Sequence, residues 1–341
     1  MNPADWNVWV QAAVFAGATA AVWLAGTRLA RLADAIASRT GIGQAAMGML
    51  LLGGVTSSPE LAVAVTATLQ GTPLLSINDV LGSAAVNLIV LAIADVAVGR
   101  DSLTTRVPKL GVVIQGVIGM MVMALVAIGT FVDGPVFLGV GSMSWLIVIA
   151  YGIGIRVLLS SRADEQWQPT GKASKDDSPD DDDPRSLRRM ITLTAVAAAV
   201  ILVAGFLLAR TGEALAERTG LGTSFFGVIV LAFATSTPEI STVLEAVRLR
   251  RYTMAISDVF GTNLFNVNIV FVVDLLHRDG SVLVEAGPFA ATAALLALLL
   301  TAIYVIGMLE RRDRAVLRMG YDTIAVVITY IAGVALLYGQ R

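Results

Sequence analysis

The sequence predicts an all-α membrane protein of ten transmembrane helices, arranged as two inverted five-helix repeats whose helices are broken at the membrane midplane. Three observations lead to this prediction. The composition is unusually apolar, long uncharged stretches follow one another along the chain, and one motif occurs twice at a wide spacing.

The composition places the chain in a lipid bilayer. Of its 341 residues, 56% are hydrophobic and only 15% are charged, which is outside the range of ordinary soluble domains. A helix needs about 20 mostly apolar residues to cross the hydrocarbon. The stretches of that length are too continuous for the alternating strands of an outer-membrane barrel. The expected helices cover 7–30, 43–70, 73–97, 108–131, 136–159, 190–210, 223–248, 253–275, 284–309 and 321–339.

The positions of the basic residues predict the orientation. If the N-terminus lies outside, 20 of the 24 Lys and Arg residues fall on the cytoplasmic side. The other four are Arg210, Arg218, Arg278 and Arg341. This bias follows the positive-inside rule, so we expect both termini outside. The absence of cysteine excludes thiolate metal sites.

The chain contains an internal repeat. Thr56-Ser-Ser-Pro-Glu60 recurs as Thr235-Ser-Thr-Pro-Glu239, 179 positions later. The same offset, without a gap, relates Asp79 to Asp258, Gly82 to Gly261, Ser83 to Thr262, Asn87 to Asn266, and Asp95 to Asp274. A register held over this length is not coincidence, so the two halves should share one fold.

The repeat divides the chain into residues 1–159, a linker of residues 160–189, and residues 190–341. Each half carries five expected spans, and because five is odd the second half must enter the membrane in the opposite orientation. Inverted repeats of this kind build many alternating-access carriers. The linker is rich in aspartate and could sense calcium, but it lacks the ligand spacing and turn glycine of a calcium loop. We therefore favour a solvated cytoplasmic connector.

Two carboxylates mark the expected site. Glu60 and Glu239 lie in the middle of apolar spans, where an ionised side chain costs at least ~2.5 kcal/mol. Pro59 and Pro238 precede them, and a proline inside a helix breaks its hydrogen bonding. The freed carbonyls and the neighbouring hydroxyls should offer oxygen ligands, which calcium and sodium prefer. The hydroxyl candidates are Thr56, Ser57, Thr235 and Ser236.

The next helix of each half offers further oxygens near the same depth. Ser83 and Asn87 are four residues apart and share a helix face, as do Thr262 and Asn266. These neutral residues also suit hydrogen bonding between helices, and both interpretations stay open. The two glutamates have no basic residue at matching depth, so they need a cation or protons. Gly82 and Gly261 should let the helices pack closely.

Four aspartates flank the asparagines. Asp79 and Asp95 lie eight residues either side of Asn87, about 12 Å along a helix. Asp258 and Asp274 flank Asn266 in the same way. They either attract cations along an access path or bind the ends of helices, and the sequence does not decide between these roles.

These motifs resemble the alpha repeats of the cation/calcium exchanger superfamily, and look most like those of prokaryotic sodium/calcium exchangers. The resemblance covers essentially the whole chain. It implies that Glu60 and Glu239 are the main calcium ligands, assisted by Ser83, Thr262, Asn87 and Asn266. Many members have asparagine where this chain has Ala84. Potassium-dependent members have aspartate at one of the positions of Asn87 and Asn266, so potassium co-transport is not expected.

The predicted function is antiport of calcium against sodium by alternating access. Two carboxylates balance one Ca²⁺, whereas an empty pair of charges cannot cross the occluded state, so other cations must occupy the site on the return. We expect the first and sixth spans to slide across a fixed core. The expected partners are the lipid bilayer of a prokaryotic inner membrane and inorganic cations, with no nucleic acid and no cofactor.

Three alternatives remain. A calcium/proton exchanger would use the same glutamates as proton carriers. An intramembrane aspartyl protease is disfavoured because the chain has no Gly-x-Gly-Asp motif, and the HExxH, GxSxG and P-loop signatures of other enzymes are also absent. A passive channel would give flux without dependence on a counter-ion.

Overall fold

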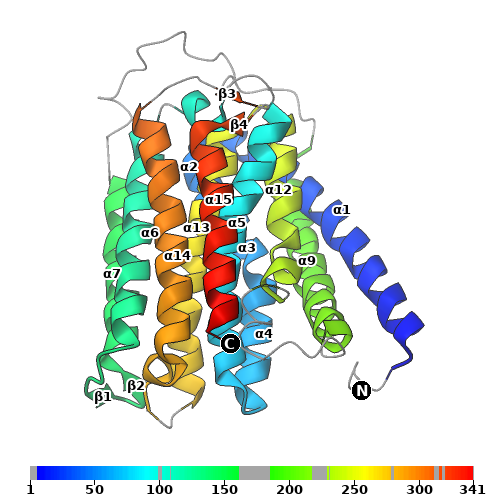
Figure 1. The fold of residues 1–341 in the computed structure, drawn as a ribbon. Helices are drawn as coiled ribbons and strands as arrows, with labels where there is room; N and C mark the ends of the chain where they lie inside the picture. Colours follow the sequence, from blue (N-terminus) through cyan, green and yellow to red (C-terminus); the bar gives the residue numbers. More distant parts are fainter. Residues whose placement is uncertain are drawn as a thin grey trace.

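The structure, a computed structural model, describes residues 6–98, 102–107, 109–160, 185–216, 229, 231–277, 280–310, 315–316 and 319–340. Within these residues, nine helices are long and apolar enough to cross a membrane. The expected span 223–248 falls partly outside the described residues. The bundle of helices is shown in Figure 1.

The first half contains five expected spans. The helices and strands are α1 (Val8–Thr40), α2 (Gln44–Ala46), the π-helix η2 (Met47–Leu52), α3 (Gly53–Thr56), α4 (Ser58–Leu69), α5 (Pro73–Val98), the 3₁₀ helix η3 (Leu103–Arg106), α6 (Leu110–Gly129), β1 (Val136–Phe137), β2 (Val140–Gly141) and α7 (Ser142–Ser160). The segment from α2 to α4 forms one interrupted span.

The second half repeats this order. Its described elements are α9 (Leu187–Ala216), α11 (Ala232–Thr235), α12 (Thr237–Arg248), α13 (Tyr252–His277), α14 (Val282–Glu310), β3 (Ala315–Val316), β4 (Met319–Gly320) and α15 (Tyr321–Gly339). The expected linker borders on α7 and α9, and its residues 161–184 lie outside the described part of the chain.

The element boundaries reproduce the offset of 179 found in the sequence. It relates both ends of α3 to those of α11, α4 to α12, α5 to α13, α7 to α15, and the hairpin β1–β2 to β3–β4. The repeats are also inverted. Arg39 near the end of α1 donates to the carbonyl of Arg185 just before α9, so these corresponding helices run in opposite directions.

Two expected boundaries were wrong. Helix α1 continues past residue 30 to Thr40 and ends at Gly41, whose φ of 73° suits glycine and whose N–H bonds to the carbonyl of Ala37. Residues 136–141, expected to be helical, form the hairpin β1–β2 instead. Its turn places Leu138 and Gly139 at positive φ, which a helix cannot accommodate.

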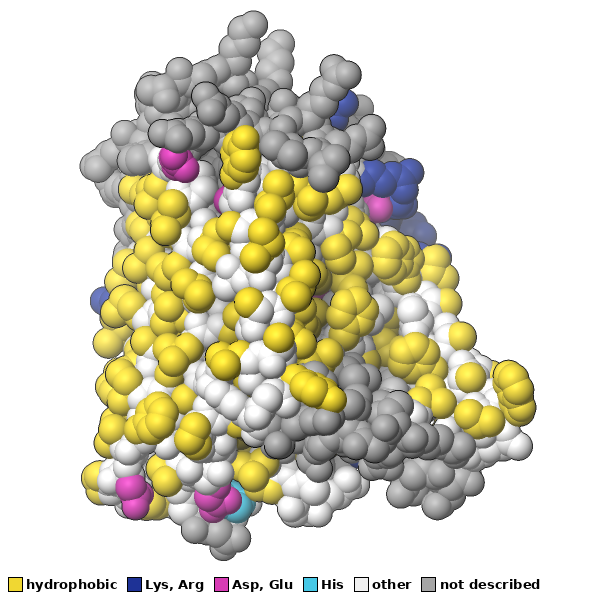
Figure 2. Space-filling model, in the orientation of Figure 1, with side chains coloured by type: hydrophobic (Ala, Val, Ile, Leu, Met, Phe, Trp, Pro, Cys, Tyr) yellow, Lys and Arg dark blue, Asp and Glu magenta, His cyan; other side chains and the backbone are white. Residues whose placement is uncertain are grey.

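Helices α5 and α13 form the centre of the bundle, and most of their residues are buried. Helices α6 and α7 lie to the left in Figure 1, and α1 lies to the right. Hydrophobic side chains cover the middle of the face in Figure 2, whereas visible acidic side chains lie mostly towards its two ends. This distribution suits a bilayer, which solvates apolar side chains and excludes charge.

The two ends of the bundle differ. Both chain termini lie at the bottom of Figure 1, and β3 and β4 lie at the top. The top, called the arginine-rich end below, also holds the end of α1, the start of α9 and the turn between α12 and α13. Its basic residues include Arg31, Arg185, Arg248 and Arg251.

Candidate cation site between the repeats

The two motif segments are interrupted helices, as expected. Helix α3 ends at Thr56 and α4 begins at Ser58, with Ser57 between them. In the second half, Ser236 separates α11 from α12 in the same way. Pro59 and Pro238 occupy the first turns of α4 and α12, where proline displaces no helical hydrogen bond.

Each interruption places its glutamate in the first turn of a helix. The N–H groups of a first turn have no partner within the helix, and the helix dipole is positive there. Both effects stabilise a carboxylate or an oxygen-rich group at this position. The helix start therefore offsets part of the cost of burying Glu60 and Glu239, but only part of it.

The interrupted segment of each half meets the central helix of the other half. Ser83 on α5 shares a hydrogen bond of 3.0 Å with Thr235. Thr262 on α13 approaches Thr56 at 3.2 Å. The repeat offset exchanges these two pairs, and all four side chains are buried. The structure thus brings together, across the boundary between the halves, hydroxyl groups predicted to share one site.

The central feature is a pair of completely buried carboxylates. Glu60 and Glu239 are each 0% exposed and close enough to repel one another. No described residue donates a hydrogen bond to any of their four oxygens. The Thr56 hydroxyl is near Glu239 but outside hydrogen-bond geometry. Arg31, Arg248 and Arg251 form their ion pairs with other acids. Buried anions in this state are unstable unless a cation or protons neutralise them.

The two predicted asparagines are buried on the central helices α5 and α13 but differ in their contacts. Neither the oxygen nor the nitrogen of the Asn266 amide has a hydrogen-bond partner among the described residues. Asn87 donates from Nδ2 to Oδ1 of Asn263 at 3.0 Å, while its own Oδ1 has no such partner. The arrangement leaves both amide oxygens available to a ligand.

Asn263 was not predicted from the sequence. Its Nδ2 donates to the carbonyl of Ala84 at 3.0 Å, so it connects α13 to α5 and orients the Asn87 amide. The repeat offset pairs Asn263 with Ala84. Because alanine carries no polar group, the comparison between the halves did not mark this position.

The oxygens of the helix interruptions are only partly available. Ser57 and Ser236 are 0% exposed, and no described residue bonds to their hydroxyls. The carbonyl of Val55, four residues before Pro59, accepts a hydrogen bond from the hydroxyl of Ser58 at 2.7 Å. That carbonyl is therefore a weaker candidate ligand than the two serine hydroxyls.

The four aspartates separate into two kinds. Asp79 and Asp258 are near the glutamates and repel them. Thr235 donates to Asp79 at 3.3 Å, and Thr242 donates to Asp258 at 2.5 Å. These two carboxylates belong to the surroundings of the site.

Asp95 and Asp274 instead bind backbone amides at opposite ends of the bundle. Asp95 accepts from Leu103 N at 2.6 Å and from Gly320 N at 2.8 Å. Asp274 accepts from Val282 N and Gly141 N, both at 2.8 Å. Each aspartate thus holds one loop of its own half and the hairpin of the other half. The contacts match the tethering interpretation, and an access-path role for them stays untested.

Two close approaches fix the interrupted span against α13. A methyl group at Gly261 would lie 2.5 Å from the Cα of Met49, and one at Gly53 would lie 2.7 Å from the Thr262 nitrogen. The expected close packing at Gly261 is therefore confirmed. Only glycine permits this contact, which sets the distance between Glu60 and the residues of α13.

A groove of about 610 Å³ lies between α4 and α9. Ser58, two positions before Glu60, lies at one part of it, and the remaining wall is mostly apolar, with Leu61, Val65 and Phe206.

Comparison with known proteins identifies the family. The family model described as "Sodium/calcium exchanger protein" matches residues 10–165 and 190–339. CaxA of Alkalimonas amylolytica, described as a proposed antiporter, is 24% identical over 88% of this chain and 92% of its own length. The inner membrane protein YrbG of Escherichia coli is 25% identical over 84% of each chain.

The fold is also that of a solved exchanger. A structure of the sodium-calcium exchanger NCX_Mj, soaked with sodium and strontium, superimposes with a TM-score of 0.71 over 96% of this chain and 99% of the other, at 15% identity. A second structure of NCX_Mj, soaked without sodium or calcium, gives a TM-score of 0.69. The chain therefore belongs to the sodium/calcium exchanger protein family and is a multi-pass membrane cation antiporter, not an enzyme.

Proposed function

We propose that this protein exchanges calcium for sodium by alternating access, through one site that contains Glu60 and Glu239. The observation that carries the proposal is the pair of fully buried carboxylates without hydrogen-bond partners among the described residues. Asn87, Asn266 and the hydroxyls of both interruptions complete the proposed ligand set.

The charges explain why such a site exchanges ions rather than leaking them. One Ca²⁺ neutralises two carboxylates, so the loaded site can pass through an occluded state. The empty site holds two like charges in a medium that solvates neither, which is costly. The return step therefore requires other cations, and the flux of calcium becomes coupled to theirs.

The neutral oxygens favour sodium as the coupling ion. Sodium, like calcium, is a hard cation that binds carbonyl, amide and hydroxyl oxygens. Asn266, Ser57 and Ser236 offer such oxygens without competing partners among the described residues. Protons carried on the carboxylates would need none of these groups. Asparagine at positions 87 and 266 adds no negative charge to those of the neighbouring carboxylates, which disfavours potassium co-transport.

The moving part in this proposal is the pair α1 and α9. The two helices pack along one another, and a smaller share of their most apolar stretch is buried than in α5 and α13. A less buried pair can slide against a well-packed centre, and this movement would open the site to alternate sides.

The decisive experiment is calcium uptake by the purified protein in proteoliposomes, with sodium, potassium and proton gradients imposed separately. We expect an outward sodium gradient to drive uptake and a potassium gradient to have no effect. Uptake driven only by a proton gradient would replace this proposal with calcium/proton exchange. Flux that needs no counter-ion would indicate a channel.

The orientation is a separate part of the proposal. We place the arginine-rich end in the cytoplasm of a prokaryotic cell and both termini outside the inner membrane. The chain has no cysteine, so single cysteines report their side without background. A membrane-impermeant thiol reagent should label Gly339→Cys in intact cells and Ser186→Cys only after lysis. The reverse pattern would invert the orientation.

A further inference from the structure

Helices α1 and α9 each touch the motif segment of the opposite half through a glycine. Gly26 of α1 packs against α12, where a methyl group would overlap Ser241 Oγ and lie 3.0 Å from Ser241 Cβ and 3.3 Å from the Pro238 carbonyl oxygen. Gly205 of α9 packs against α4, where a methyl group would overlap the ring of Pro59 and lie 2.8 Å from its Cβ. Both glycines are buried.

These two contacts are related by the repeat. The offset of 179 separates Gly26 from Gly205 and Pro59 from Pro238. It also exchanges the halves, so α1 reaches the motif of the second half and α9 reaches that of the first. Each proline directly precedes a glutamate of the candidate site. A movement of α1 or α9 at its glycine therefore acts one residue from a buried carboxylate.

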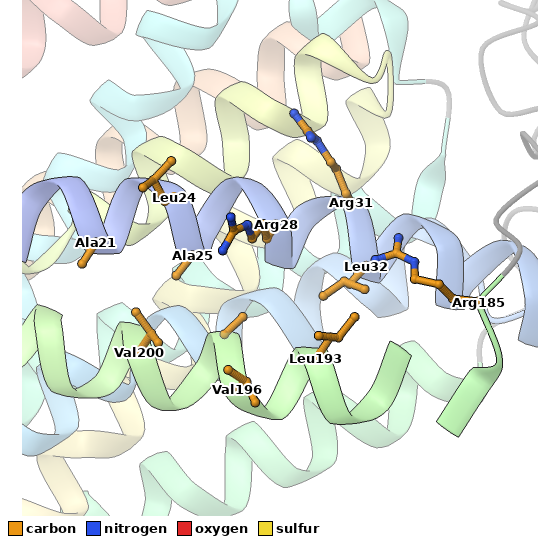
Figure 3. A pocket seen from close by; sticks show the side chains of 11 residues that line it. Ala21, Leu24, Ala25, Arg28, Arg31, Leu32, Arg185, Leu193, Val196 and Val200 are labelled. Atoms are coloured by element: carbon orange, nitrogen blue, oxygen red, sulfur yellow. The ribbon is translucent and has the colours of Figure 1, made fainter. Parts of the chain in front are cut away.

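Open grooves lie beside the glycine contacts. Figure 3 shows the groove of about 550 Å³ between α1 and α9, which is lined by Ala25, the residue before Gly26, and by Val200 of α9. The groove between α4 and α9 is lined by Phe206, the residue after Gly205. Each glycine thus makes its close contact at the border of a groove, not within a continuous interface.

A glycine at such a contact lowers the barrier to sliding. The side chains of packed helices interlock as ridges in grooves, and one helix moves along another only when these ridges separate. Glycine adds no side chain to the ridge, so the backbone of the moving helix comes close to the proline without interlocking with it. A larger residue would either hold the helix away from the motif or lock it in one position.

We propose that Gly26 and Gly205 are positioning residues of the transport cycle, at which α1 and α9 slide past the prolines beside the glutamates. The inference rests on the alternating access proposed above and is independent of the coupling ion. It assigns a role in transport to two residues that lie outside the proposed ligand set.

The test is the exchange of radioactive calcium across proteoliposomes that contain the whole protein, with calcium at equal concentration on both sides and no other ion gradient. Only the calcium-loaded site must cross in this assay, so the result does not depend on which ion drives net transport. We expect Gly205→Ala and Gly26→Ala to lower the maximal rate of exchange by about tenfold, because overpacking strain then opposes the movement. The calcium affinity of the purified variants should stay unchanged, because every proposed ligand remains.

Two further variants make the result specific. Gly17→Ala is the matched control and should exchange at the original rate, because Gly17 is an exposed position of α1 with nothing within 4 Å of the added methyl group. Gly26→Ala/Ser241→Ala removes the oxygen that the methyl group at Gly26 would overlap and should recover most of the rate. This recovery decides the question if Gly205→Ala does not fold.

Equal rates of exchange in the Gly17→Ala, Gly26→Ala and Gly205→Ala proteins would overturn the inference. A parallel loss of rate and calcium affinity would overturn it as well, because it would show that the glycines only support the folded site. Calcium flux through the unmodified protein that needs no calcium on the far side would reject alternating access itself, and the inference with it.

Discussion

Asp34 on α1 and Arg251 in the turn after α12 form an ion pair of 2.7 Å, with only 14% and 6% of their side chains exposed. Gln44 donates a further hydrogen bond of 2.9 Å to the same oxygen of Asp34. The pair therefore attaches the end of α1 to the second half of the bundle. The repeat does not duplicate it, since threonine stands at position 72, 179 residues before Arg251.

Arg251→Gln should lower the stability of the protein, because it leaves Asp34 charged and mostly buried. Breaking a buried pair on one side costs about 3–5 kcal/mol. The measurement is thermal unfolding in detergent. Asp34→Asn/Arg251→Gln removes both charges and should recover most of the loss. An Arg251→Gln protein as stable as the original would show that the pair contributes nothing.

Glu60→Gln and Glu239→Gln should each abolish calcium-coupled transport and weaken calcium binding by at least about 100-fold. Each substitution leaves one carboxylate for a divalent ion, so a charge-assisted ligand is lost from a site of low dielectric. Calcium titration of the purified variants measures the effect. Neither variant should be less stable without calcium, because each removes a buried charge.

The control for the glutamates is Glu285→Gln, which changes a carboxylate that is 44% exposed and outside the proposed site. It should keep normal binding and transport. Unchanged calcium affinity in both Glu60→Gln and Glu239→Gln would contradict the assignment of the site.

Gly53→Ala should disturb the site, whereas Gly54→Ala should not. The methyl group at Gly53 meets the backbone of Thr262 at 2.7 Å, while nothing lies within 4 Å of the equivalent position at Gly54. Overpacking of this kind costs about 1–3 kcal/mol. Thermal unfolding and calcium affinity should both fall for Gly53→Ala. If Gly53→Ala and Gly54→Ala have the same stability and calcium affinity, the contact of Gly53 with α13 adjusts to a methyl group without cost.

Asp95→Asn and Asp274→Asn should reduce stability without changing the KM for calcium. Each aspartate accepts two backbone hydrogen bonds, and bonds to charged groups contribute about 1.5–3 kcal/mol each. Unfolding temperature and uptake at varied calcium concentration separate the two roles. A higher KM that depends on salt, at unchanged stability, would favour the access-path role instead.

Asn263→Ala should weaken cation affinity by about tenfold, as is typical when a residue that orients a ligand is lost. It frees the Asn87 amide to rotate while leaving every proposed ligand in place. Asn268→Ala is the control, because Asn268 donates within its own helix to the carbonyl of Leu264. If both variants bind calcium equally well, Asn263 does not position Asn87.

The duplicated motifs made most of the fold predictable from the sequence. The long apolar stretches predicted the spans, and the prolines predicted the interruptions at Ser57 and Ser236. The common offset indicated which residues of the two halves would meet. The pairing of Ser83 with Thr235 follows from that symmetry. Features that occur in only one half were missed, because a comparison of the two halves does not reveal them.

Asn263 and the pair of Asp34 with Arg251 are of this kind. The hairpins were missed for another reason. Val136 and Phe137 are apolar enough to extend a helix, and only the turn at Leu138 and Gly139 shows that they do not. The aspartates at 95 and 274 lie at the distance expected for an access path, but their backbone partners come from loops whose course the sequence does not reveal.

The crossed contacts of Asp95 and Asp274 also constrain biogenesis. Gly320, the partner of Asp95, is synthesised 225 residues after it, and Gly141 is synthesised 133 residues before its partner Asp274. Neither half can complete its own loops alone. A product that stops before Gly320 would therefore leave one acceptor oxygen of Asp95 without its backbone donor.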